Sequence, residues 1–238
     1  MLICIDAGHG AHDPGACGNG LEEKDINLQL ALLLNKKLKS IGVETSMVRN
    51  DDTFMSINKR VAFANPSDLL ISIHCNSGSE TSTGFETWVS KGSPGSTKEM
   101  AHTIHYNVHQ ATKKWIERDR GLKLRPDSGK EKLGVLTDTK CHAVLIECGF
   151  ISNPSEAKVL INKEYQEALT DALVISVIEI FKLNVKYPPT TTKHNVLFKG
   201  KPYTLEMENV NGKNRIYIAE LNKLGFKVGY EKGMVTID

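Results

Sequence analysis

Three short apolar runs in this chain each lead to a residue that can do chemistry. The runs and the residues that follow them are Leu2–Ile5 with His9, Asp68–Ile73 with His74, and Ala143–Ile146 with Glu147. Apolar runs of this length with β-branched members predict buried strands. Because strands of an open α/β sheet place functional groups just past their carboxyl ends, we expect the two imidazoles and the carboxylate to meet at one sheet edge.

Helices are predicted between these strands. The clearest is Glu23–Ile41, where apolar residues recur at helical spacing, lysines lie near the end, and Gly42 is a stop signal. Further helices are predicted over 56–65, 96–116, 154–161 and 163–182, further strands over 43–48 and 84–90, and a long ordered loop over the polar residues 117–140. This alternation favours a three-layer α/β/α domain with a mixed, mostly parallel sheet.

A change in composition near residue 184 predicts a second, smaller domain. Residues 184–193 hold Pro188-Pro189 and three threonines, which is typical of a stiff linker. We therefore expect one domain over 1–183, a linker over 184–193, and a small α+β domain over 194–238. Its expected elements are strands over 195–198 and 202–206, a helix near 213–224, and a hairpin of Lys227-Val228 with 234–237.

The net charge and the lengths of the apolar runs argue against nucleic-acid and membrane partners. The net charge of +2 gives no reason to expect a nucleic-acid partner, although residues 184–238 hold nine Lys and Arg against five Asp and Glu. That local excess favours an anionic polymer or surface, or is a chance imbalance of a few charges. The first strand starts at residue 2 and no apolar run reaches membrane-spanning length, so we expect synthesis in the cytoplasm and no membrane partner.

Five cysteines without paired spacing predict reduced thiols, mostly in the core, rather than a disulfide framework. They are Cys4, Cys17, Cys75, Cys141 and Cys148.

The residues at the predicted sheet edge suggest a metal site. A catalytic zinc site uses three nitrogen or oxygen ligands and keeps one position open, and His9 and His74 supply two of the three. The third ligand stays open among Asp6, Asp13, Glu22, Glu23 and Asp25. Glu147 is the best candidate for a base that takes a proton from water. Each residue also has an ordinary structural interpretation, such as a polar turn, a core histidine or a helix-start glutamate.

Four motifs stand in a fixed order along the chain. They are IDAGHG and DPGA within Ile5–Ala16, LEEKDINLQLA at Leu21–Ala31, SIHCN at Ser72–Asn76, and VLIECGFISNPSE at Val144–Glu156. Together they resemble the zinc-dependent N-acetylmuramoyl-L-alanine amidases of the Amidase_3 type, over residues 1 to about 182. Ala7 and Ala11 stand where that family frequently has proline and glycine.

The resemblance implies roles for four residues. His9, Glu23 and His74 would be the ligands of one Zn²⁺ per chain, and Glu147 would be the catalytic glutamate. Glu23 matches better than Glu22 because the family's ligand directly precedes a Lys-Asp pair, here at residues 24 and 25. No residue that contacts substrate is assigned.

The implied reaction is hydrolysis, by zinc-activated water, of the amide between N-acetylmuramic acid and the L-alanine of the stem peptide in bacterial peptidoglycan. The organisation resembles a phage or prophage endolysin that acts on the cell wall after release. Alternatives are a host autolysin or a spore or mother-cell lysis amidase of the same chemistry, a zinc peptidase or amidohydrolase with another substrate, and a catalytically inactive wall-binding protein.

The small domain has a resemblance of its own. Residues 208–238 are similar to the strand, helix and hairpin pattern of copper amine oxidase N-terminal-like modules. This predicts a module that binds anionic wall polymers, or one that forms a homodimer.

Overall fold

The protein forms two compact units, Met1–Val185 and Lys186–Asp238, in a computed structural model of its 238 residues. The residues described are 1–130, 132–185 and 187, followed by strand residues 191–198, 201–210, 213–216, 228–231 and 234–237.

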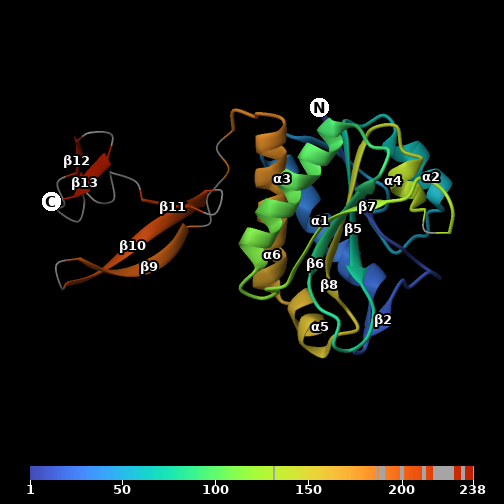
Figure 1. The fold of residues 1–238 in the computed structure, drawn as a ribbon, viewed down its shortest axis with the longest axis horizontal. Coiled ribbons are helices and arrows are strands. Elements are labelled where there is room, and N and C mark those ends of the chain that lie inside the picture. The colour runs from blue at the N-terminus through green and yellow to red at the C-terminus, as the bar shows by residue number, and fades with distance from the viewer. Residues whose placement is uncertain are drawn as a thin grey trace. The chain divides into compact units, whose positions relative to one another are not determined.

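A six-stranded sheet forms the centre of the first unit (Figure 1). In spatial order its strands are β4 (Glu44–Met47), β1 (Leu2–Ala7), β5 (Leu69–Asn76), β8 (His142–Phe150), β6 (Phe85–Ser90) and β7 (Asp119–Arg125). The first four are parallel, β6 runs antiparallel to β8, and β7 runs parallel to β6. The prediction of a mixed, mostly parallel sheet is therefore confirmed.

Helices cover both faces of this sheet (Figure 1). One face carries α1 (Glu23–Ser40), α3 (Gly95–Thr112) and α6 (Lys163–Ile180), and the other carries α2 (Ile57–Ala64) and α4 (Gly134–Thr137). The short helix α5 (Pro154–Leu160) follows β8 and is capped by the Asn153 side chain. Helix α1 buries Leu30, Leu34 and Leu38 at four-residue spacing, as its sequence pattern predicts. In the described part of the chain, no helix has the length and apolarity that a bilayer span requires.

The prediction of a long loop over residues 117–140 is wrong in part, because β7 and α4 lie within it. Strand β7 is an edge strand whose leucines alternate with cations at Arg120, Lys123 and Arg125. Long cationic side chains are common on sheet edges, where they oppose pairing with other chains. A one-residue irregularity near Gly121 disturbs the alternation, which is why the sequence looked like a loop.

A short hairpin that was not predicted precedes α1. It consists of β2 (Cys17–Gly18) and β3 (Leu21–Glu22), and α1 begins at the next residue.

The five cysteines all carry free thiols, and the three in strands β1, β5 and β8 are buried.

The second unit contains two antiparallel groups of strands. They are β9 (Thr191–Phe198), β10 (Lys201–Val210) and β11 (Lys213–Ile216), and the hairpin of β12 (Val228–Glu231) with β13 (Met234–Ile237). The predicted helix near 213–224 is wrong at its start, because Lys213–Ile216 pairs with β10. In the sequence, Asn211-Gly212 stands between these two strands, and an Asn-Gly pair between strand-like segments is a signal for a hairpin. The helix prediction gave too little weight to that signal. The rest of that prediction, 217–224, lies outside the described residues, and β9 begins three residues inside the predicted linker.

Candidate metal centre

The turn after β1 holds His9 in a conformation that is rare for a residue with a side chain. Its φ is 64°, in the left-handed region. Two buried arginines, Arg49 and Arg60, each donate to two main-chain carbonyls within residues 7–9, at 2.6 to 2.9 Å. Arg60 also pairs with the buried carboxylate of Asp6 at 2.5 Å. These bonds fix the turn and therefore fix where the imidazole of His9 points.

His9, Glu23 and His74 converge at the carboxyl edge of the parallel strands. His9 Nε2 lies 3.3 Å from Glu23 Oε2, and His74 Nδ1 lies 2.9 Å from Glu23 Oε1. One nitrogen or oxygen atom from each residue lies within 4.8 Å of the other two. Glu23 comes from the first turn of α1, so the cluster joins three separate elements.

The Glu23 carboxylate is buried and held in place by main-chain donors. The amides of Ala16 and Cys75 donate to it at 2.9 and 3.0 Å. Burial raises the pKa of Glu23, but hydrogen bonds with His74 and His9 outweigh it and hold that pKa well below its usual range. Burial lowers the pKa of His9, but the bond to Glu23 prevails and raises it to about 9. The carboxylate therefore favours positive charge between the two rings.

A second layer of contacts orients the cluster. Asp13 Oδ2 lies 2.9 Å from His9 Nδ1, which leaves Nε2 of that ring facing Glu23. A Cβ atom at Gly15 would lie 2.7 Å from Glu23 Oε2, and one at Gly8 would overlap the ring of His74. The glycines are therefore required by close approach to the cluster.

Glu147 lies beside the cluster on the next strand. It pairs in register with His74 across β5 and β8. Its Oε2 atom is buried and has no hydrogen-bond partner among the described residues. Burial raises the pKa of Glu147 to about 8, and Glu23 and Glu86 add to the rise, whereas His74 and Arg125 oppose it. Buried acceptors are nearly always paired, so an unpaired one beside a histidine cluster indicates a site for a ligand or a proton.

A second buried carboxylate, Glu86, was missed by the sequence analysis. It lies opposite Glu147 on β6 and is 3% exposed. Its four donors are Asn76 Nδ2 at 2.8 Å, Trp88 Nε1 at 3.0 Å, and Arg120 Nε and Lys123 Nζ at 2.5 Å each. The alternation of residues 84–90 placed Glu86 on the same strand face as Trp88. Its cationic partners, however, lie in the segment that was predicted as a loop.

Of the five carboxylates left open as a third ligand, Glu23 is the one that reaches both imidazoles. The other four are engaged or exposed: Asp6 pairs with Arg60, Asp13 with the far side of His9, Glu22 with Lys24 at 3.4 Å, and Asp25 is exposed. No second group of three metal-ligating side chains occurs among the residues that the structure describes.

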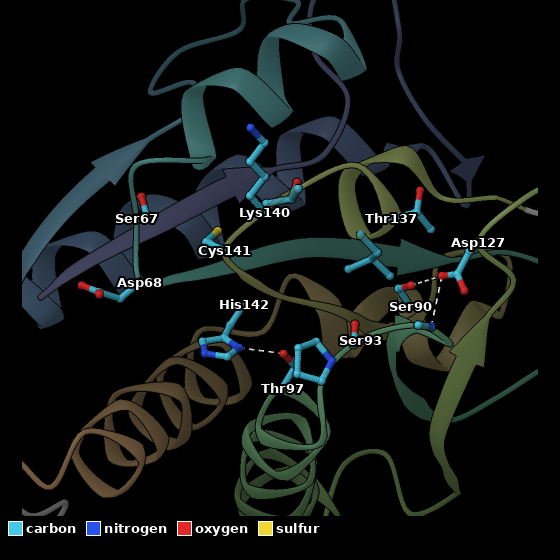
Figure 2. Close-up of a pocket in the computed structure, with 14 residues that line it drawn as sticks. Ser67, Asp68, Ser90, Ser93, Thr97, Asp127, Thr137, Lys140, Cys141 and His142 are labelled. Carbon is cyan, nitrogen blue, oxygen red and sulfur yellow. Dashed lines mark hydrogen bonds between the residues drawn. The ribbon is translucent and has the colours of Figure 1, made fainter.

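A cavity of about 520 Å³ lies at the opposite ends of β5 and β8 (Figure 2). Its polar side chains bond one another: Thr97 with His142 at 2.6 Å, and Asp127 with the Ser90 hydroxyl and the Gly92 amide. The second acid that lines it, Asp68, accepts from the Leu2 amide at 2.7 Å, so both acids and the imidazole already bond protein groups. The Ser67 hydroxyl is buried without a hydrogen-bond partner among the described residues, but neither acid nor the imidazole of the cavity is left unpaired beside it. The cluster around Glu23 is the better candidate for a functional site.

Two imidazoles and a carboxylate at the edge of an α/β sheet, next to an unpaired carboxyl group, are typical of hydrolases that use a metal ion. The sequence pattern of the Amidase_3 family, described as N-acetylmuramoyl-L-alanine amidase, matches residues 3–179. The chain therefore belongs to the Amidase_3 family and is a peptidoglycan hydrolase.

Relatives of known name agree with this assignment. The endolysin of Bacillus phage SPP1 is 32% identical over 240 residues, covering 97% of this chain and 80% of the phage protein. The sporulation-specific N-acetylmuramoyl-L-alanine amidase of Bacillus subtilis is 38% identical over 173 residues, covering 71% of this chain and 64% of that protein. The crystal structure of an N-acetylmuramoyl-L-alanine amidase from Clostridium difficile 630 superposes with a TM-score of 0.69 at 35% identity, covering 77% of this chain and 97% of that one.

Proposed function

We propose that this protein is a zinc-dependent N-acetylmuramoyl-L-alanine amidase in which His9, Glu23 and His74 hold one Zn²⁺ and Glu147 is the catalytic glutamate. The observation that carries the proposal is the convergence of the three donor atoms within 4.8 Å beside the unpaired carboxyl of Glu147. Two of the three donors are also held from outside the cluster, since Asp13 orients His9 and two main-chain amides orient Glu23.

The residues present fit zinc by their chemistry. Two imidazole nitrogens and one carboxylate oxygen form a donor set that zinc favours in catalytic sites, which keep a further position for water or substrate. When bound, the ion supplies Lewis-acid chemistry, polarising a carbonyl group and making water more acidic. The buried carboxylate of Glu23 supplies negative charge at this point, 3.3 Å from His9 Nε2 and 2.9 Å from His74 Nδ1.

Glu147 moves the proton. Its carboxylate takes a proton from the attacking water and then donates it to the nitrogen of the leaving stem peptide. The Oε2 atom of Glu147 has no hydrogen-bond partner among the described residues, so this acceptor is free to take that proton.

The first test joins metal content with wall hydrolysis. We expect the purified full chain to hold about one zinc per molecule, to lose activity on cell walls after chelation, and to regain it when zinc is added back. New amino termini on alanine identify the amidase reaction, whereas new reducing sugar ends would identify a glycosidase. Hydrolysis by protein that contains no metal would contradict the proposal.

We further propose that the protein acts as an endolysin, made in the cytoplasm and reaching the wall after release. The similarity to the SPP1 endolysin supports this role because it extends over 97% of this chain, including residues beyond the first unit. In producing cells, the wall should stay intact until the membrane is permeabilised and should then be cleaved rapidly. Wall cleavage during synthesis, with the membrane intact, would contradict this role.

The second unit is proposed to bind anionic wall polymers, because the sequence from residue 184 onward has an excess of four positive charges. The full chain should bind walls that carry anionic polymers better than stripped walls. Equal binding, together with a dimer in solution, would favour the dimerisation role instead.

A further inference from the structure

Glu147 stands between two differently charged parts of the same sheet face. His74 on β5, Glu147 on β8 and Glu86 on β6 are paired in register, so their side chains form one row across three strands. In this row, His74 belongs to the proposed metal site, and Glu86 lies on β6, next to the edge strand β7. The side chains around Glu86 therefore form the side of Glu147 that faces away from the metal site.

That side carries more positive than negative charge. Arg120 and Lys123 both bond the same oxygen of Glu86, whose other oxygen accepts from Asn76 and Trp88. One carboxylate thus neutralises one of two cations. The two cationic side chains are 25% and 29% exposed, so each presents further N–H donors at the surface.

Arg125 adds a third cation to this side. Its guanidinium lies 4.0 Å from the centre of the Trp88 ring, which holds it in place. Its Nε atom is buried and makes no hydrogen bond to the described residues. We call Arg120, Lys123 and Arg125, with the Glu86 and Trp88 that fix them, the basic strip.

The chemistry places the leaving peptide on this side. The scissile carbonyl must face the metal site and the scissile nitrogen must face Glu147, which protonates it, so the peptide continues away from the metal. Strand β7 lies two strand spacings beyond β8, about 10 Å, which an extended peptide covers in about three residues. Arg120 and Lys123, which bond Glu86 directly opposite Glu147, are therefore within reach of the first residues of the stem peptide. Arg125 pairs in register with Ser90, two residues further along β7 than Lys123, and faces a later part of the peptide.

We infer that the basic strip is a binding subsite for carboxylate groups of the stem peptide, with Lys123 and Arg125 as the donors that contact them. The inference rests on the proposed function, because it uses Glu147 as the proton donor to the leaving nitrogen. Glu86 acts as a positioning residue: it orients Arg120 and Lys123 and takes no part in the reaction.

The test compares two forms of one substrate. Purified walls are used untreated, or after their peptide carboxylates have been converted to neutral amides with carbodiimide and ammonia. The full, metal-loaded chain should release alanine amino termini about tenfold more slowly from the amidated walls, the loss expected for one charge-assisted hydrogen bond. Lys123→Gln and Arg125→Gln should lose about the same factor on untreated walls and little more on amidated ones.

Lys39→Gln is the matched control, because Lys39 is an exposed cation in the last turn of α1 and its loss changes the net charge equally. It should behave as the unaltered protein does on both kinds of wall. Equal rates of the unaltered protein on the two walls would overturn the subsite. So would variants that lose the same factor on both, since that pattern indicates a structural role. Absence of new alanine amino termini from either wall would instead refute the amidase proposal itself.

Discussion

Cationic side chains lie on both sides of Glu147, toward β1 and toward β7, but they have different roles on the two sides. On the β1 side, Arg49 and Arg60 are 3% and 4% exposed and donate to main-chain carbonyls that shape the turn of His9. On the β7 side, Arg120 and Lys123 share one carboxylate oxygen and remain about a quarter exposed. Buried arginines whose nitrogens all donate to protein oxygens build geometry, whereas partly exposed cations keep donors available for a ligand.

The largest expected effect comes from the residue between the two sides. Glu147→Gln removes the proton acceptor but keeps the size of the side chain, so amide hydrolysis should fall by about 10²- to 10⁴-fold. Zinc content should be unchanged because Glu147 is not among the proposed ligands. The measurements are zinc per chain and the rate of alanine amino-terminus release, with Glu99→Gln on the exposed surface of α3 as the control. A zinc-loaded variant that keeps its activity would remove Glu147 from the mechanism.

The second prediction contrasts the two kinds of cation directly. Arg60→Met leaves the buried carboxylate of Asp6 without its cationic partner, with only the Ser72 hydroxyl as a donor among the described residues, and should destabilise the fold by about 3–5 kcal/mol. Lys123→Gln should cost about 1 kcal/mol or less, because Arg120 still pairs with Glu86 and the lysine is partly solvated.

Chemical denaturation of both variants measures the difference. Adding Asp6→Asn to Arg60→Met should restore part of the lost stability, since it removes the unpaired charge. Equal destabilisation by Arg60→Met and Lys123→Gln would mean that Lys123 is as important for folding as Arg60, which contradicts its assignment as a ligand-binding cation.

The third prediction concerns the contact that orients His9. Asp13→Asn weakens the partner of His9 Nδ1 and should lower zinc affinity by about 10- to 100-fold, with little change in folding. Competition with a zinc-binding dye measures the affinity. Asp25→Asn is the control, because that carboxylate is exposed in the first turn of α1. If both variants bind zinc as the unaltered chain does, the Asp13 contact does not support the site.

Much of the first unit could be predicted because each local signal agreed with the fold. The strands that end near His9, His74 and Glu147 are continuous apolar runs, which is how strands buried on both faces look. Helix α1 shows regular apolar spacing and places Glu23 in its first turn. Residues on such elements meet at one edge for topological reasons, so the approach of His9, His74 and Glu147 could be expected from the sequence pattern. Glu23 was one of five open carboxylates, and only the family resemblance singled it out.

The basic strip could not be predicted in the same way. Arg120, Lys123 and Arg125 lie on an edge strand whose polar composition looks like a loop, and their partner Glu86 is a charged residue buried by contacts distant in sequence. The roles of Arg49 and Arg60 were missed for the same reason, since nothing in the sequence marks which arginines bond main-chain carbonyls 41 to 53 residues away. Side-chain pairing across the sheet decides both cases.

The smallest expected effect is a change in the pH dependence of stability, and it comes from the Glu147 carboxyl rather than from the cations on either side of it. Burial raises the pKa of Glu147 from 4.5 to about 8, so the folded, metal-free chain binds a proton that the unfolded chain has lost between these pH values. The stability of the metal-free protein should therefore fall as pH rises from about 4.5 to about 8. Glu147→Gln carries no such proton and should lack this part of the fall.

The metal-free variant should match the unaltered metal-free protein near pH 4.5 and exceed it above about pH 8, by about 1 to 2 kcal/mol. The effect is smaller than the full pKa shift implies because the side chain keeps some contact with solvent. Titration of His9 and His74 also lowers stability as pH rises in both proteins. Because Glu147 helps to raise the pKa of His74, the difference between the two proteins reports the Glu147 proton together with its coupling to His74. A difference that does not change with pH would mean that the carboxyl is already ionised in the folded chain, neutralised by the cationic groups on its two sides.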